Sequence, residues 1–123
     1  MRPIAVEHGM GMVVWSPLAF GILTGKYDDG LPQGARLTRI DWLREAEYAE
    51  QKIQRVREFT THAERLGCSR AQLALAWAAV QNGVSSVILG VTRLEQLREN
   101  LGALDIQLTE DVTAGIDDLF PPL

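Results

Sequence analysis

The sequence predicts an α/β fold in which two parallel strands are joined by helices. The first strand is predicted over residues 12–15, where Met, Val, Val and Trp form a continuous apolar run typical of a strand buried on both faces. The second is predicted over residues 84–89 and ends at Gly90. Helical patterns fill the chain between them, and this order is typical of a right-handed parallel crossover unit.

Length and composition restrict the class of protein. With 123 residues, the chain has the length of one domain, so residues 1–123 are treated as a single unit. The net charge of −4 argues against a general nucleic-acid-binding surface. The single cysteine, Cys68, excludes an internal disulfide and, with two distant histidines, gives no metal-ligand spacing. With no signal peptide and no apolar run near the ~20 residues of a membrane span, we expect a cytoplasmic protein.

A helix and a turn are predicted around the first strand. Residues 3–8 are predicted to end a helix, because Pro3 suits its first turn and Gly9 its end. Ser16-Pro17 is predicted to end the strand, because Pro17 has no N–H for the sheet and favours an extended backbone at Ser16.

The segment after this strand has the composition of an anion-binding loop. Gly21 and Gly25 allow the backbone to approach another group closely, and Lys26 adds a positive charge. Residues 28–41 are predicted to form a loop rich in turn residues. It contains Arg36 and Arg39, which form a local cationic patch with Lys26. Two interpretations of this cationic patch remain, a solvated loop and a ligand-binding loop.

Residues 42–66 are predicted to be helical, and Gly67 is predicted to end the helix. The polar stretch 42–51 is either part of this helix or a separate short helix. The inward positions are predicted to be Ile53, Val56, Ala63 and Leu66. Tyr48 and Lys52 have the Tyr-x-x-x-Lys spacing of short-chain dehydrogenases. Because no glycine-rich fingerprint follows a first strand, we interpret this pair as part of a charged helix face.

Two further helices are predicted from their first residues. Ser69 and Gln72 form a capping box that begins a helix closed by residues 82–83. Its predicted buried stripe is Leu73, Ala76, Trp77 and Val80. Thr109 is predicted to begin the last helix, which ends near Phe120-Pro121-Pro122 and turns Val112, Ile116 and Leu119 inward.

The helix after the second strand is predicted to begin with a capping box of Thr92 and Glu95. Its free N–H groups and positive dipole end suit a phosphate, and Arg93 adds charge. The residues predicted to face the core are Leu94, Leu97 and Leu101. Those left on another side are Gln96, Glu99 and Asn100, either as a plain polar face or as ligand-binding residues.

Two segments together resemble the aldo-keto reductases, most closely the voltage-gated potassium channel β-subunit group. The first is Trp15-Ser16-Pro17-Leu18 with Gly25-Lys26-Tyr27, which is similar to the segment after the family's seventh strand. The second, residues 87–100, is similar to the eighth strand and its cofactor-binding helix. The resemblance implies the C-terminal half of a (β/α)8 TIM barrel, since 123 residues are about half of a barrel of ~250 residues.

The resemblance implies that this half binds NADP(H). Trp15 would stack on the nicotinamide, Lys26 and Arg36 would contact phosphate oxygens, and Thr92 would contact the 2′-phosphate. The full set of cofactor-binding residues implied is Trp15, Ser16, Pro17, Leu18, Gly21, Lys26, Arg36, Gly90, Thr92, Gln96, Glu99 and Asn100. Of these, the last three would hold the adenosine.

The family is implied to reduce carbonyls with NADPH, using a tyrosine, a lysine, an aspartate and usually a histidine. Those residues belong to earlier strands, and no counterpart is found here, so no catalytic residue is assigned and the chain alone is expected to be inactive. The alternatives are a cofactor-binding or channel-regulatory module without chemistry, and a truncated product stabilised by self-association. Two strands cannot close a barrel, so we expect a homo-oligomer or a missing N-terminal half. A membrane-channel partner is implied by the resemblance only.

Overall fold

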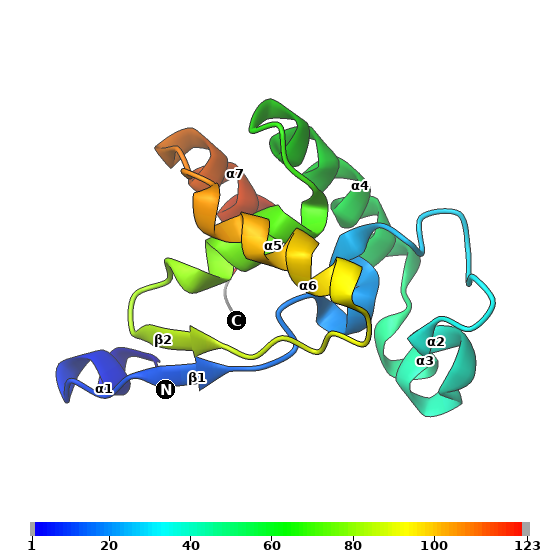
Figure 1. Cartoon of the computed structure of the whole chain (residues 1–123), viewed down its shortest axis with the longest axis horizontal. Helices are drawn as coiled ribbons and strands as arrows, with labels where there is room; N and C mark the ends of the chain where they lie inside the picture. The colour runs from blue at the N-terminus through cyan, green and yellow to red at the C-terminus, as the bar shows by residue number, and fades with distance from the viewer. Residues whose placement is uncertain (1, 122–123) are drawn as a thin grey trace.

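The computed structural model describes residues 2–121, so Pro122, expected to help end the last helix, lies outside the described residues. The chain alternates helices with two strands (Figure 1). In chain order the elements are α1 (Arg2–Glu7), β1 (Met12–Val14), the 3-10 helix η1 (Ala19–Thr24), α2 (Arg36–Arg39), α3 (Asp41–Glu47), α4 (Glu50–Arg65), α5 (Arg70–Ala79), β2 (Val84–Val87), α6 (Leu94–Leu101), the 3-10 helix η2 (Gly102–Asp105) and α7 (Glu110–Leu119).

The two strands lie side by side and run parallel, as predicted (Figure 1). Val13 is opposite Ser86 and Val14 is opposite Val87, with an irregularity next to Met12. Both strands are shorter than the apolar runs that predicted them. The N–H of Ile88 still donates to the carbonyl of Val14 at 2.8 Å, so the pairing extends just beyond β2.

The prediction that the first strand is buried on both faces is wrong for this chain. Val13 is 60% exposed, and Trp15, just beyond β1, is 71% exposed. The reason is that β1 has one neighbouring strand, and α5 packs on the sheet through β2. The expected exposure of strand faces in a sheet of two strands is therefore observed.

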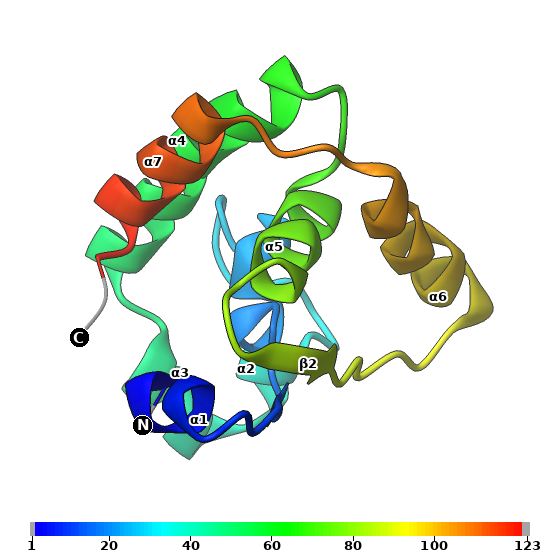
Figure 2. The same cartoon turned by 90° about the vertical axis from the view of Figure 1, so that its left-hand side faces the viewer.

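Helices α4 to α7 lie on one side of the sheet (Figures 1 and 2). Helix α5 lies between β2 and the pair α4 and α7, while α6 lies beside α5 (Figure 2). One core cluster joins α4, α5 and α7, and its buried residues are Phe59, Ala63, Leu73, Ala74, Val112 and Ile116. Another lies under η1, α2 and α3, with Ile22, Tyr27, Leu37, Leu43, Ile53 and Val56. The second cluster supports the segment that carries Lys26.

The polar stretch before α4 is a separate helix, α3, as the sequence allowed. Tyr48 ends it and packs edge-on against Tyr27, while Lys52 forms an ion pair with Glu47 at 2.8 Å. These contacts agree with a structural role for the Tyr48 and Lys52 pair. The prediction of a loop over residues 28–41 is incomplete, because the short helix α2 lies inside it.

The capping box of α5 is confirmed. Gln72 N–H donates to the Ser69 hydroxyl at 3.2 Å, and Ser69 N–H donates to the Gln72 side chain at 3.1 Å. The predicted stripe is wrong at its end, since Val80 is 62% exposed where α5 runs out. Trp77 is half-buried, and its indole N–H donates to Asp117 of α7 at 3.2 Å.

The start and orientation of α6 differ from the prediction. The helix begins at Leu94 with Arg93 at the N-cap, and Gln96, not Glu95, reaches back to the chain before it. The predicted faces are also wrong, since Leu94 and Leu101 are exposed, Leu97 is half-buried and Asn100 is buried. The last helix is confirmed, with Val112 and Ile116 buried and Leu119 half-buried.

Candidate functional site

The chain turns sharply where β1 ends. The prediction of an extended Ser16 is wrong, because its φ is +53°. The preference that Pro17 imposes is overridden by a turn in which the Ala19 N–H donates to the Ser16 carbonyl at 2.9 Å. Ala19 and Phe20 also have positive φ values, of 47° and 57°. Three strained residues therefore lie at the carboxyl end of a parallel strand, where α/β folds place ligand sites.

Trp15 presents an aromatic surface beside this turn. Its ring meets Phe20 edge-on, with 6.3 Å between centroids and 70° between planes. Phe20 is a contact that sequence reasoning missed, since no local pattern predicts its left-handed backbone. Of the predicted residues that follow Trp15, Pro17 is half-buried and Leu18 packs against two core clusters. Leu18 therefore anchors the turn.

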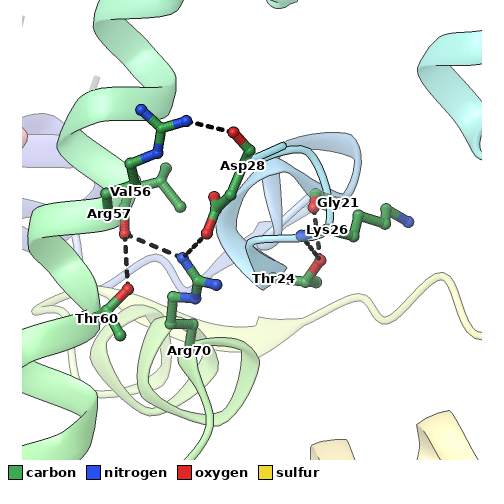
Figure 3. A network of polar contacts seen from close by, with 8 residues as sticks. All are labelled: Gly21, Thr24, Lys26, Asp28, Val56, Arg57, Thr60 and Arg70. Atoms are coloured by element: carbon green, nitrogen blue, oxygen red, sulfur yellow. Dashed lines mark hydrogen bonds and ion pairs between the residues drawn. The ribbon is translucent and has the colours of Figure 1, made fainter. Parts of the chain in front are cut away.

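The predicted close approaches at Gly21 and Gly25 are present, and the groups that approach are side chains of this chain. A Cβ on Gly21 would lie 2.4 Å from the Lys26 Cε, and one on Gly25 would lie 1.7 Å from an Arg70 guanidinium nitrogen. Both glycines have positive φ, which a larger residue adopts at a cost. Figure 3 shows Lys26 and Arg70 on different sides of this turn.

Three cationic residues come together from separate segments. The pKa of Lys26 lies below its ordinary value of 10.5, chiefly because partial burial desolvates the ammonium, and also because Arg36 and Arg93 repel its charge. Arg36 belongs to α2, and Arg93 is the N-cap of α6. The Lys26 Nζ also lies 5.3 Å from the centroid of the Tyr27 ring. The two motifs thus contribute to one electropositive region, which includes Arg93, the residue that the sequence predicts to add charge at the start of α6.

The segment before α6 is organised by Gln96. Its Oε1 accepts from the Thr92 N–H at 2.9 Å, the Thr92 hydroxyl at 3.2 Å and the Arg93 N–H at 3.3 Å. Gln96 thus holds Thr92 and Arg93 next to each other, and Thr92 is exposed. Open space surrounds Gly90, where an added Cβ would meet nothing within 4 Å. The exposed Thr92 and Arg93 therefore flank the first turn of α6.

Glu99 and Asn100 lie on different sides of α6. Glu99 is exposed, and its carbonyl accepts from the Gln72 side chain at 2.9 Å. Asn100 is 8% exposed and faces inward. It lines a cavity of about 230 Å³ between α5, β2 and α6, together with Leu75, Ala76, Ala79, Val84, Ser85, Ser86, Val87, Leu89, Leu101, Ala103 and Leu104. The structure therefore does not place the two residues on one polar face.

Asp28 and Arg70 form a polar contact that sequence reasoning missed. Their side chains pair at 2.7 Å, and each is 19% exposed. The residues are 42 positions apart in the sequence, so no local pattern joins them. Figure 3 shows this pair beside the turn that carries Lys26.

Within residues 2–121 there is no group of three or more His, Cys, Asp and Glu side chains arranged to hold a metal ion. None of the helices in this range has the length and apolar character needed to cross a membrane. The arrangement best suits an anionic ligand with an aromatic part, because Trp15 and Lys26 both lie on the segment between β1 and α2.

Comparison with protein families gives one match. A family model described as "Aldo/keto reductase family" matches residues 1–120. The match spans both motifs and nearly the whole chain. It indicates an oxidoreductase-type function, and proteins of this family generally use nicotinamide cofactors.

Proposed function

Since the chain belongs to the aldo/keto reductase family, we propose that it forms the NADP(H)-binding part of a carbonyl-reducing enzyme. The proposal includes the C-terminal half of a (β/α)8 barrel and a likeness to the potassium channel β-subunit type. A bound NADPH supplies the hydride that reduces a carbonyl, while the chain binds and orients the cofactor. No catalytic acid is proposed here, because Tyr27 is fully buried and Tyr48 packs against it.

The meeting of Lys26, Arg36 and Arg93 carries this proposal. Cations that repel one another in the free protein are stabilised when phosphate oxygens bind between them, because each then gains an opposite charge. A cofactor with a pyrophosphate and a further 2′-phosphate offers several such groups. Thr92 and Arg93 are the residues proposed for the 2′-phosphate, because they are exposed at the start of α6.

The remaining roles follow from exposure. Trp15 offers its ring to the nicotinamide, and Ser16, Pro17 and Leu18 form the turn along the pyrophosphate. Gln96 and Glu99 lie near the surface of α6 and suit the adenosine. Asn100 serves the adenosine only if this part of the cofactor reaches the cavity that Asn100 lines.

The test is a titration of the whole chain with NADP(H), with NAD(H) as control, followed by tryptophan fluorescence. We expect saturable quenching and a preference for the phosphorylated cofactor. The Trp15→Phe variant should lose most of the quenching, whereas Trp42→Phe should keep it, because Trp42 is an equally exposed tryptophan of α3 outside the site. Quenching that persists in Trp15→Phe, or no binding of either cofactor, would contradict the proposal.

A second candidate is a module that binds cofactor or docks on a partner, such as a channel, without chemistry. The exposed apolar residues of the sheet favour it, since Val13 and Ile88 offer surface to another protein segment. On either proposal this surface is covered by an N-terminal barrel half or by another copy of the chain. Carbonyl-dependent oxidation of NADPH by the pure chain would exclude the module and contradict the assignment of no catalytic residue.

A further inference from the structure

We propose that Arg70, together with Asp28, is a positioning residue that holds the turn 25–28 and thereby directs Lys26 toward the phosphate groups of the ligand. The identity of the ligand in this inference rests on the proposed function. The contacts that support the inference are independent of that function. Neither residue is among the cofactor-binding residues that the resemblance implies.

The first step is the contact between α5 and the turn. Arg70 is the first residue of α5, whose capping box fixes its backbone. Its guanidinium pairs with the Asp28 carboxylate at 2.7 Å and lies against the backbone of Gly25, where a Cβ could not fit. The same nitrogen reaches the Val56 carbonyl at 3.5 Å. One side chain therefore contacts both ends of the turn and a neighbouring helix.

The second step is that α4 holds the same turn. The Arg57 guanidinium donates to the backbone carbonyl of Asp28. The Asp28 N–H donates to the Gly25 carbonyl at 3.1 Å, which closes the turn around Lys26 and Tyr27. Figure 3 shows Arg57 and Arg70 on one side of the turn, with the Lys26 side chain leaving on the other.

The third step links the turn to a second cation. Tyr27 is fully buried, and its hydroxyl accepts from the Leu37 N–H at 3.2 Å. Leu37 follows Arg36 in α2. A turn held by Arg70 therefore sets the position of Lys26 directly and that of Arg36 through Tyr27.

The pair is also sensitive to the loss of one partner. The Asp28 Oδ1 is buried and has no hydrogen-bond partner among the described residues. The ion pair between Arg70 and the other oxygen, Oδ2, therefore stabilises this carboxylate. Without Arg70 the carboxylate would be left unpaired in a partly buried place, and moving the turn toward water relieves that cost. The Lys26 ammonium would then move away from Arg36 and Arg93.

The test uses the Lys26 side chain as an NMR probe after ¹³C-methylation. Titration without cofactor gives its pKa. In Arg70→Met and in Asp28→Ala we expect the pKa of Lys26 to rise, because the ammonium moves into water and away from the arginines.

The Asp28→Ala variant separates displacement from direct charge effects. Removing a nearby carboxylate would by itself lower the pKa of Lys26, whereas displacement raises it. Arg65→Met is the matched control, since Arg65 pairs with Asp111 in a contact where both side chains are about half exposed. A pKa of Lys26 that falls or stays constant in Asp28→Ala would overturn the proposal.

A second measurement ties the turn to its ligand. Binding of inorganic pyrophosphate should weaken roughly tenfold in Arg70→Met. Arg70→Lys should restore part of this loss, because the ammonium keeps the ion pair but not the contact with Gly25. Unchanged binding in Arg70→Met would contradict the role of Arg70. Failure of the unaltered chain to bind pyrophosphate would instead contradict the proposed function, and the lysine titration would still decide whether Arg70 positions Lys26.

Discussion

The Lys26 side chain lies across the backbone of Gly21, so that a Cβ on Gly21 would stand 2.4 Å from the lysine Cε and 2.6 Å from its Nζ. Gly21 is buried and has a φ of +97°. The absence of a side chain at this position therefore sets where the ammonium can lie.

Replacing Gly21 by alanine should displace Lys26. We expect Gly21→Ala to lose about 1 kcal/mol of stability through backbone strain and to weaken NADP(H) binding as well. Gly34→Ala is the control, because Gly34 has a φ of +78° but nothing within 4 Å of an added Cβ. It should lose stability and keep its affinity. Chemical denaturation and fluorescence titration measure the two effects, and equal losses of affinity in both variants would argue against the role of Gly21.

Cofactor affinity should begin to fall at a lower pH than it would if Lys26 had the ordinary pKa of a lysine. The pKa of Lys26 is lowered, first by partial burial and then by Arg36 and Arg93, and phosphate binding requires the charged form. Affinity is therefore complete below the pKa of free Lys26 and declines as the pH rises through it. Dissociation constants measured between about pH 7 and about pH 10 should show the decline. In Lys26→Arg it should be absent, because a guanidinium stays charged in this range.

Stability has the opposite pH dependence at this residue. The pKa of Lys26 is lower in the folded protein than its ordinary value, so the protonated form destabilises the free protein. This cost begins to fall as the pH rises through the folded-state pKa, and it is gone above the ordinary value of 10.5. The Lys26→Met variant should accordingly gain stability at neutral pH relative to the unaltered chain, and the gain should shrink as the pH rises.

Arg36 and Arg39 offer a matched comparison on α2. Both are exposed, and Arg36 is the one that contributes to the electrostatic environment of Lys26. We expect Arg36→Gln to weaken NADP(H) binding about tenfold and to reduce its dependence on salt. Arg39→Gln should change neither quantity appreciably. Equal effects would show that overall charge, and not a site, determines binding.

The Ser69 cap should contribute to the stability of α5. Its hydroxyl accepts from Gln72 N–H at 3.2 Å, and Ser69→Ala removes this bond from the first turn. The free energy of unfolding should fall by about 1 kcal/mol. Ser86→Ala, at an exposed position of β2, should change it by less than about 0.5 kcal/mol. Urea denaturation of both variants measures the difference.

The exposed sheet should make the chain associate. A size-exclusion column should show the unaltered chain as larger than a monomer, and Val13→Glu should shift it toward the monomer, because a charge on this strand opposes burial. Val80→Glu, at a similarly exposed apolar residue at the end of α5, should not. A stable monomer of the unaltered chain would contradict the expectation.

Local patterns predicted most of the helices. The capping box at Ser69 and the end at Gly67 depend on neighbouring residues, so the sequence alone was sufficient. The start of α6 was mispredicted because Glu95 and Gln96 are both able to reach back, and only the conformation of Arg93 selects Gln96. The burial of Val13 was mispredicted because an apolar run shows only that a strand is suited to burial. Whether the strand is buried depends on the elements that pack against it, and β1 pairs with β2 alone among the described residues.

Residues of the candidate site could be proposed from the sequence where they belong to a motif. Lys26 and Arg36 were identified from the loop, and the structure brings them together with Arg93. The contact of Asp28 with Arg70 joins residues 42 positions apart, and nothing near either residue signals it. Its position depends on how α5 packs against the turn, which is a property of the tertiary structure.

The strained turn after β1 bears on the thermodynamics of ligand binding. Ser16, Ala19 and Phe20 keep left-handed backbones that glycine would adopt more easily. Packing must therefore restrict this turn to one conformation before any ligand arrives. A site that is already ordered loses little conformational entropy on binding, and calorimetry should record a small entropic penalty. Glycine at Ala19 would relieve the strain and increase that penalty.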